Sequence, residues 1–212
     1  HEIRNSLVPL STHAQLIDKK IDQPNFQASL KNSIIKETAR IKRFSEQMLY
    51  MAQSSLAGSN ELALAQLVED AFDRARSQLG NSSAQLTFDN QSRSSQLKGN
   101  SEALTYAIEE LFINSMQAAP DKQEIKVVLT EDEEGILRIK LRDSGSGLSS
   151  TVIEQAAEPF FTTRYTGVGL GLSVANKIVS EHGGYLRLYP RDDKHEWDVE
   201  IELPSLLIPS TR

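Results

Sequence analysis

Asp143-Ser144-Gly145-Ser146-Gly147 is the first of three motif segments, two of them rich in glycine, in the last third of the chain that decide its fold. Glu158-Pro-Phe-Phe-Thr-Thr-Arg164 follows it, and Gly167-Val-Gly-Leu-Gly-Leu172 then leads into an apolar helix. Upstream, Glu110 and Asn114 stand four residues apart in an apolar run. Glycines let backbone N–H groups approach phosphates, a helix start favours anions, and a carboxylate can accept from a purine amine. The ordered set predicts a site for a purine nucleotide.

Composition and charge exclude several classes of protein. The 212 residues include 23 Lys and Arg against 29 Asp and Glu, a net charge of −6, so no nucleic-acid partner is expected. The absence of cysteine excludes disulfides and thiolate metal sites and fits a reducing cytoplasm. No apolar run approaches the roughly 18 residues of a membrane span, and we find no signal peptide, so we expect a cytoplasmic location without membrane contact. Because the chain opens inside a helical pattern, we expect a fragment of a longer protein. The sequence does not decide whether that longer protein has a membrane anchor.

The first part of the chain has the apolar spacing of two packed helices. Apolar residues recur every three or four positions from Ile3 to Ile21 and again from Phe26 to Met51, with turn residues at 22–25 between them. Glu37 is the one polar member of the second series. Two helices joined by a short loop predict an antiparallel helical hairpin. A hairpin of about 50 residues cannot bury two apolar stripes well, so we predict a homodimer with a four-helix bundle.

The second part of the chain mixes helices and strands. We place the all-α hairpin at 1–54, a linker at 55–62 and a second domain at 63–212. Helices are predicted at 65–78 and 102–118 and from Gly171 to His182, and strands at 84–90, 96–99, 124–130, 136–142, 185–189 and 197–203. Because there is no regular βαβ alternation, the pattern favours an α+β two-layer sandwich over a doubly wound sheet.

Over nearly its whole length the chain resembles the cytoplasmic catalytic core of a two-component sensor histidine kinase. His1-Glu-Ile-Arg-Asn5 matches the phospho-acceptor box of that family, and Glu110-Leu-Phe-Ile-Asn114 matches its asparagine box. The segments 143–147, 158–164 and 167–172 match the boxes that follow, in family order. The resemblance implies the Bergerat-type ATP-binding fold shared with gyrase, HSP90 and MutL. It also implies ATP and Mg2+ as cofactors.

Three residues at the front of the chain receive catalytic roles from this resemblance. His1 would be the nucleophile, since a neutral imidazole nitrogen is nucleophilic near pH 7. Glu2 would hold or take the proton of the other ring nitrogen and stabilise the cation that forms on attack. Asn5 lies one turn beyond His1 on the same helix face, where the family implies an amide that positions a hydrolytic water.

The resemblance assigns the remaining site residues to the nucleotide. Glu110, also catalytic, would order a water or assist proton movement, and Asn114 would bind Mg2+ through its amide oxygen. An ordinary polar pair on a solvated helix face is the alternative for these two. Asp143 would accept from the adenine amine, and Arg164, in a lid at 162–167, would bind the γ-phosphate. The other nucleotide-binding residues would be Gly145, Gly147, Thr163, Gly167, Gly169, Leu170 and Gly171.

The implied activity is ATP-dependent autophosphorylation of His1, followed by phosphoryl transfer to an aspartate of a response regulator receiver domain, with phosphatase activity toward that partner. A catalytically weak, nucleotide-binding dimeric signalling scaffold is the alternative. A relative that uses the same ATP fold for another purpose is a third hypothesis, which the His1-Glu2 pair argues against.

Three polar residues outside these boxes complete the expectations. Asn100 stands where the family usually has Asp before the helix at 102–118. His182 is expected at a helix end, where a charged imidazole is favourable to the helix dipole. His13 lies one position from the apolar series and is expected to face solvent.

Overall fold

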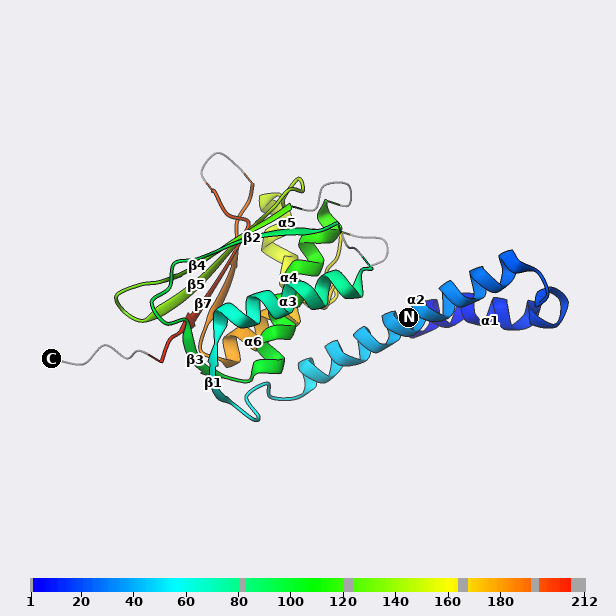
Figure 1. The fold of residues 1–212 in the computed structure, drawn as a ribbon, viewed down its shortest axis with the longest axis horizontal. Helices are drawn as coiled ribbons and strands as arrows, with labels where there is room; N and C mark the ends of the chain where they lie inside the picture. Colours follow the sequence, from blue (N-terminus) through cyan, green and yellow to red (C-terminus); the bar gives the residue numbers. More distant parts are fainter. Residues whose placement is uncertain (1, 81–82, 120–123, 164–167, 192–194, 207–212) are drawn as a thin grey trace. The chain divides into compact units, whose positions relative to one another are not determined.

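The computed structural model describes residues 2–80, 83–119, 124–163, 168–191 and 195–206. They divide into two compact units, His1–Ala52 and Gln53–Arg212, which are drawn in Figure 1. Within the described ranges, no helix combines the length and the apolar character that a membrane crossing needs.

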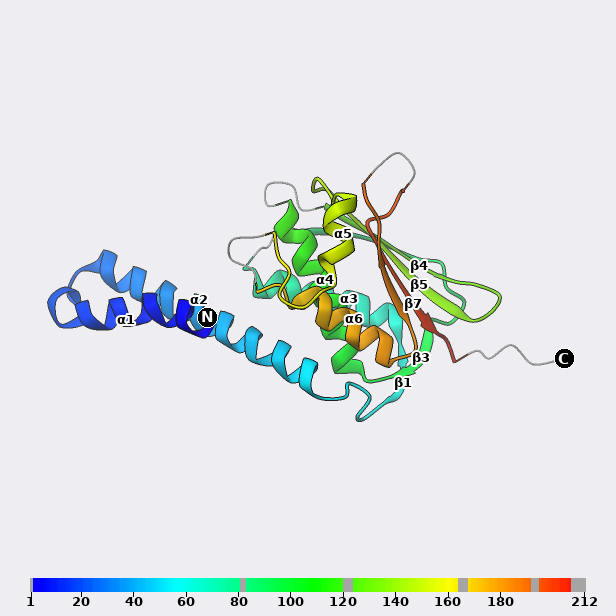
Figure 2. The same ribbon diagram turned by 180° about the vertical axis from the view of Figure 1, so that it is seen from behind.

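The first unit consists of two helices, α1 (Glu2–Lys20) and α2 (Pro24–Ala52), which lie side by side and run in opposite directions (Figures 1 and 2). His13 of α1 joins them, because its Nε2 lies 3.0 Å from Ser29 Oγ and its ring centroid lies 5.6 Å from that of Phe26. The expectation that His13 faces solvent is therefore wrong. A position beside an apolar series also lies at the edge of the helix contact, so the imidazole is half-buried there.

Much of the apolar surface of α1 and α2 is exposed within one chain. Phe26 is buried and so is Glu37, the polar member of the second series. The large apolar side chains that stay exposed on the two helices are Ile3, Leu7, Val8, Ile34, Ile35, Met48 and Leu49, and Ile21 is exposed in the turn between them. Two helices can shield only one side of each other, so this surface needs a further partner to leave water.

The second unit is built on a mixed sheet, with five strands in the described part of the chain. Its order is β2 (Gln85–Asn90), β4 (Glu124–Glu131), β5 (Ile136–Asp143), β7 (Val199–Pro204) and β6 (Tyr185–Leu188). The pair β2·β4 is parallel and the other pairs are antiparallel. A separate antiparallel pair joins β1 (Asn60–Ala63) to β3 (Gln96–Gly99).

Helices cover one face of this sheet, as Figures 1 and 2 show from opposite sides. They are α3 (Leu64–Gln78), α4 (Ser101–Ala118) and α6 (Gly171–Glu181), while α5 (Ser150–Ala156) follows β5. The central helix α4 is buried along most of its length, and Phe112 within it makes an edge-to-face contact with Phe72 of α3 at 5.4 Å between centroids. The predicted α+β two-layer sandwich is confirmed.

The alternation of side chains along the strands explains why there are only two layers. On β5, Leu137, Ile139 and Leu141 are buried against the helices, while the residues between them point to the outer face. That outer face is charged: Arg138 of β5 and Arg187 of β6 both lie 3.0 Å from Glu202 of β7. Such exposed pairs stabilise little individually, but they keep this side of the sheet in water.

The segment expected as a linker at 55–62 is more ordered than predicted. Its end belongs to β1, where Asn60 lies opposite Gly99 of β3. Its start is anchored too, because the backbone N–H and the hydroxyl of buried Ser55 both donate to Glu181 Oε2, at 2.7 and 2.6 Å. A strand of four residues is too short for its alternation of side chains to be recognised in the sequence. Helix α5 was also not predicted, because its seven residues are too few to show a helical period.

His182 lies at the end of α6, as predicted, and contacts the start of α4. Asn100 caps the helix, since its Oδ1 accepts from Ala103 N at 3.0 Å. The backbone N–H of Asn100 donates to His182 Nε2 at 3.0 Å, so that nitrogen carries no proton, and Nδ1 donates to Ile178 O at 2.7 Å. The buried ring of His182 therefore connects the end of α6 to the start of α4. The amide Nδ2 of Asn100 also donates to Ala57 O, a bond that an Asp could not make.

Candidate nucleotide site

Glu110 and Asn114 of α4 do not lie on a solvated helix face. Glu110 is only 1% exposed, and Asn114, one turn later on the same side of the helix, is half-buried. Leu111 and Phe112 beside them are buried, and so is a second acid, Glu109. A buried carboxylate followed by a half-buried amide oxygen is costly unless both groups have polar partners. Glu110 and Asn114 therefore belong to a polar part of a largely buried helix.

The loop after β5 lies against the end of α4. Asp143 is the last residue of β5, and its Oδ1 accepts a hydrogen bond from Gly145 N at 2.8 Å, which turns the chain back. A Cβ at Gly145 would lie 3.0 Å from both the Cβ and the carbonyl oxygen of Ala118, the last residue of α4. Glycine at 145 thus lets the Asp143 loop pack directly on the helix that carries Asn114.

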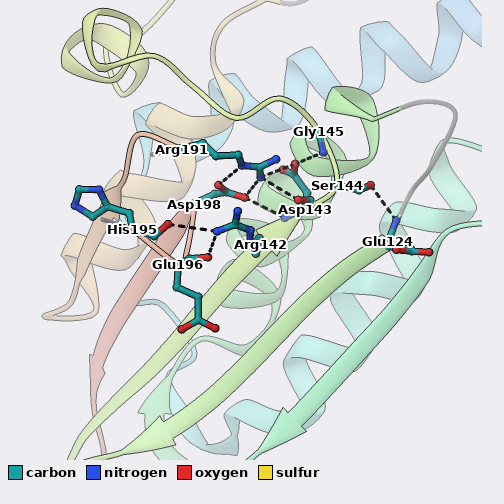
Figure 3. A network of polar contacts seen from close by, with 9 residues as sticks. All are labelled: Glu124, Arg142, Asp143, Ser144, Gly145, Arg191, His195, Glu196 and Asp198. Carbon is teal, nitrogen blue, oxygen red and sulfur yellow. Dashed lines mark hydrogen bonds and ion pairs between the residues drawn. The ribbon is translucent and has the colours of Figure 1, made fainter. Parts of the chain in front are cut away.

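A charged network surrounds Asp143, and Figure 3 shows it from close by. Arg191 donates from Nη2 to the carbonyl oxygen of Asp143 at 2.9 Å and lies 3.3 Å from its Oδ1. Arg191 also binds Asp198 through Nε at 2.9 Å and through Nη2. Asp198 in turn accepts from the backbone N–H of Asp143 at 3.1 Å. Neither Arg191 nor Asp198 was identified from the sequence.

Burial and charge act in opposite directions on the pKa of Arg191. Its burial favours the neutral form, but Asp198 and then Asp143 outweigh that effect and hold the pKa above its ordinary value. These carboxylates therefore favour the charged form of the guanidinium. It compensates two carboxylates that are each only about a tenth exposed.

The contact with Arg191 explains why position 147 requires glycine. It adopts a φ of +73°, and a Cβ there would lie 2.6 Å from the Cβ of Arg191. Any other residue at 147 would displace Arg191 from its position beside Asp143. The glycine was expected because of phosphates, but its described contact is with this arginine.

Gly169 likewise allows a close approach within the protein. Phe160 N donates to Gly169 O at 2.9 Å, and a Cβ at Gly169, whose φ is +73°, would lie 2.4 Å from the carbonyl oxygen of Phe161. Two consecutive segments of the motif series are joined at this point. The contact is made by the backbone of Phe160, whose side chain is 63% exposed.

The other predicted site residues divide between described and undescribed parts of the chain. Leu170 is buried, Gly171 begins α6, and Thr163 is exposed beyond Phe161. Asn5 is exposed on α1 in the first unit. Predicted residues that lie outside the described part are His1, the side chain of Glu2, Arg164 and Gly167. The structure therefore brings together Asp143, Gly145 and Gly147 beside the end of α4, and Gly169 beside the Glu158–Phe161 segment.

The chemistry of the described groups fits a nucleotide with a divalent ion. Asp143 presents a largely buried carboxylate, which can recognise an amine. Asn114 has an amide oxygen, a donor that Mg2+ accepts when phosphates and waters fill its other positions. No transition-metal ligand type is needed for this purpose.

Comparison with known proteins agrees with these features. A family model described as "Histidine kinase-, DNA gyrase B-, and HSP90-like ATPase" matches residues 99–206. Sensor histidine kinase ZraS of Escherichia coli is 25% identical over 194 residues, which cover 92% of this chain and 42% of that protein. Sporulation kinase E of Bacillus subtilis is 27% identical over 194 residues, covering 92% of this chain and 26% of its own. The chain thus spans less than half the length of these curated relatives.

The fold has counterparts among solved structures. That of Acinetobacter baumannii histidine kinase AdeS superimposes with a TM-score of 0.68 over 97% of this chain and 98% of its own, at 17% identity. At this level of identity the likeness concerns the fold alone. It extends over both units of the chain.

Proposed function

Because this chain belongs to the histidine kinase-, DNA gyrase B- and HSP90-like ATPase family, we propose that it is the core of an ATP-dependent sensor protein-histidine kinase. The second unit binds ATP with Mg2+, and His1 receives the γ-phosphoryl group. The names of the relatives, a sensor histidine kinase and a sporulation kinase, support this assignment. The observation that carries it is the placement of Asp143 and its glycine loop against the end of the helix that bears Glu110 and Asn114.

In this proposal each described residue has a separate task on the nucleotide. Asp143 accepts from the exocyclic amine of adenine and so selects the base. Asn114 holds Mg2+, which neutralises charge on the phosphates when bound, and buried Glu110 orients water or a proton nearby. Thr163 belongs to the lid at 162–167, where Arg164 and Gly167 complete the phosphate contacts, and Gly169 and Gly171 follow the lid in sequence. Such a site acts mainly by positioning and electrostatics, as phosphoryl transfer requires.

The phosphoryl step itself needs few groups at the acceptor. One ring nitrogen of His1 attacks the γ-phosphorus, the bond from that phosphorus to the bridging oxygen breaks, and ADP leaves. Glu2 takes or holds the proton of the other ring nitrogen. The phosphoryl group then passes from His1 to the carboxylate of an aspartate in a response regulator receiver domain, where a carboxylate oxygen replaces the nitrogen.

The exposed apolar side chains of α1 and α2 support a dimeric first unit. Residues such as Leu7, Ile34 and Met48 are 42–48% exposed in one chain although they occupy heptad positions. A second copy of the same helix pair would cover them in a four-helix bundle. Exposed Asn5, one turn beyond His1, would then position the water of a phosphatase reaction toward the response regulator.

Labelling with ATP tests this function. The chain is incubated with γ-labelled ATP and Mg2+, and the label on the protein is tested for stability in acid and in base. Acid-labile, base-stable label that disappears in His1→Gln is the expected result. Because His1 stands at the start of the chain, a longer version that continues upstream is measured in parallel.

The controls separate kinase activity from nucleotide binding. Asn5→Ala is expected to keep the label, since its proposed role is in dephosphorylation, whereas Asn114→Ala is expected to lose it. Nucleotide binding without any label in both the short and the extended chain would contradict the kinase assignment. That result would favour the signalling scaffold instead.

A further inference from the structure

The residues around Asp143 hold both its backbone and one of its carboxylate oxygens in place. Its backbone is held at both ends, since its N–H donates to Asp198 and its carbonyl oxygen accepts from Arg191. One carboxylate oxygen, Oδ1, accepts from Gly145 N and lies 3.3 Å from Arg191 Nη2. Among the described residues, no hydrogen bond engages the other oxygen, Oδ2. The network therefore orients Asp143 so that one oxygen stays available to a ligand.

Charge explains why the arginine is needed. Asp143 and Asp198 approach each other through Arg191, and both side chains are largely buried. Without a cation between them, two neighbouring carboxylates repel each other and would move apart. An adenine amine donates a hydrogen bond, so the residue that recognises it must present an acceptor at a fixed place. If the Asp143 carboxylate turned away, the site would no longer distinguish adenine from a base that presents an oxygen at the same position.

We propose that Arg191, bound by Asp198 and packed against Gly147, is a positioning residue that holds the Asp143 carboxylate in place and correctly oriented for adenine, and that it thereby sets the base specificity of the site. This inference rests on the proposed nucleotide-binding function. Arg191 acts through Asp143 and does not itself contact the nucleotide. It also explains why glycine occupies position 147, where a Cβ would displace the arginine.

The test compares two nucleotides that differ at the recognised group. Binding of ADP and of inosine diphosphate, which has an oxygen where adenine has the amine, is measured by calorimetry with Mg2+. A hydrogen bond to a charged group corresponds to roughly a ten- to hundredfold difference in affinity. The wild-type chain is therefore expected to prefer ADP by at least about tenfold. In Arg191→Met we expect this preference to fall to about threefold or less.

Arg142 supplies a matched control. Like Arg191 it reaches the segment before β7, donating from Nη1 to the carbonyl oxygens of His195 and Glu196, but it makes no contact with the Asp143 carboxylate (Figure 3). Arg142→Met should keep the preference for ADP. If both variants lost the preference for ADP equally, the preference would depend on the conformation of the segment before β7 and not on Arg191 in particular. That result would overturn the proposal.

Further variants distinguish the possible failures. If Asp143→Asn leaves the preference for ADP intact, or the wild-type chain has none, the proposed base recognition fails. If Asp143→Asn abolishes the preference but Arg191→Met does not, only the present inference fails. Tighter ADP binding in Arg191→Met would also overturn it, since the arginine would then compete with the base.

The conservative replacement guards against misfolding. Arg191→Lys keeps the charge but cannot span two carboxylates, so an intermediate preference is expected. Circular dichroism of each variant establishes that it is folded. If Arg191→Met is not folded, the lysine variant decides: a preference equal to that of the wild-type chain contradicts the proposal.

Discussion

Replacing Glu181 by Gln should destabilise the second unit in a way that depends on pH. Oε2 of Glu181 accepts from the N–H and the hydroxyl of Ser55, at 2.7 and 2.6 Å, and Oε1 lies 2.6 Å from Lys177 Nζ. Burial would raise the pKa of this carboxyl, but the hydrogen bonds from Lys177 and Ser55 outweigh it and lower the pKa from 4.5 to about 2. The glutamine variant loses the charge and presents an amide to these donors.

The size of the effect follows from that pKa. The difference between 4.5 and about 2 corresponds to about 3 kcal/mol of stability at neutral pH. Because the side chain of Glu181 is 27% exposed, solvent reduces the contribution, and we expect about 2 kcal/mol. The folded carboxyl has the lower pKa, so this stability is fully present above pH 4.5 and is lost as the pH falls toward 2.

Urea unfolding measures this contribution directly. Trp197 is the single tryptophan of the chain and lies in the second unit, so its fluorescence follows the unfolding of that unit. Glu181→Gln should lower the free energy of unfolding by about 2 kcal/mol at pH 7 and by clearly less at pH 3. Glu69→Gln, at an exposed position on α3, is the control and should change it by less than about 0.5 kcal/mol. Equal losses in the two variants, or a loss that does not shrink in acid, would refute the reasoning.

Three further changes are predicted from local geometry, each measured by the same unfolding assay. Gly169→Ala should cost at least about 2 kcal/mol more than Gly58→Ala, since both glycines have φ near +75° but only Gly169 would bring its Cβ within 2.4 Å of a carbonyl oxygen; similar costs would contradict this. Phe112→Ala should lower stability by about 3–5 kcal/mol, because the ring is fully buried; a loss below about 1 kcal/mol would show that the layer can collapse around it. Asn100→Asp should preserve the cap of α4 but lose the hydrogen bond to Ala57 O. Asn100→Ala loses that bond and about 1 kcal/mol of capping as well, so it should lower the free energy of unfolding more than Asn100→Asp does. A larger loss in Asn100→Asp would exclude a capping role.

The α+β layer was predictable from the sequence because its elements are long and strongly patterned. Alternation along β5 and the apolar run of α4 are each sufficient to identify the element, and the glycines after Asp143 indicate a turn. These signals depend on neighbouring residues. They therefore survive without knowledge of distant contacts.

The parts that escaped prediction depend on contacts between residues far apart in the chain. Arg191 is 48 positions from Asp143, and nothing near it in sequence distinguishes it from an ordinary loop arginine. The hydrogen bond that His182 accepts at Nε2 comes from the backbone N–H of Asn100, 82 positions away. Motifs identify which residue types a site requires. They do not identify the residues that hold those types in place.

The short edge strand β6 influences how copies of this protein can meet. It has only four residues, and its outward Arg187 is about half exposed while it is paired with acids of β7. A brief, charged border offers few backbone groups for another sheet to extend. Growth of strands from molecule to molecule is thereby discouraged at this border. We therefore expect any self-association to involve the exposed apolar side chains of α1 and α2.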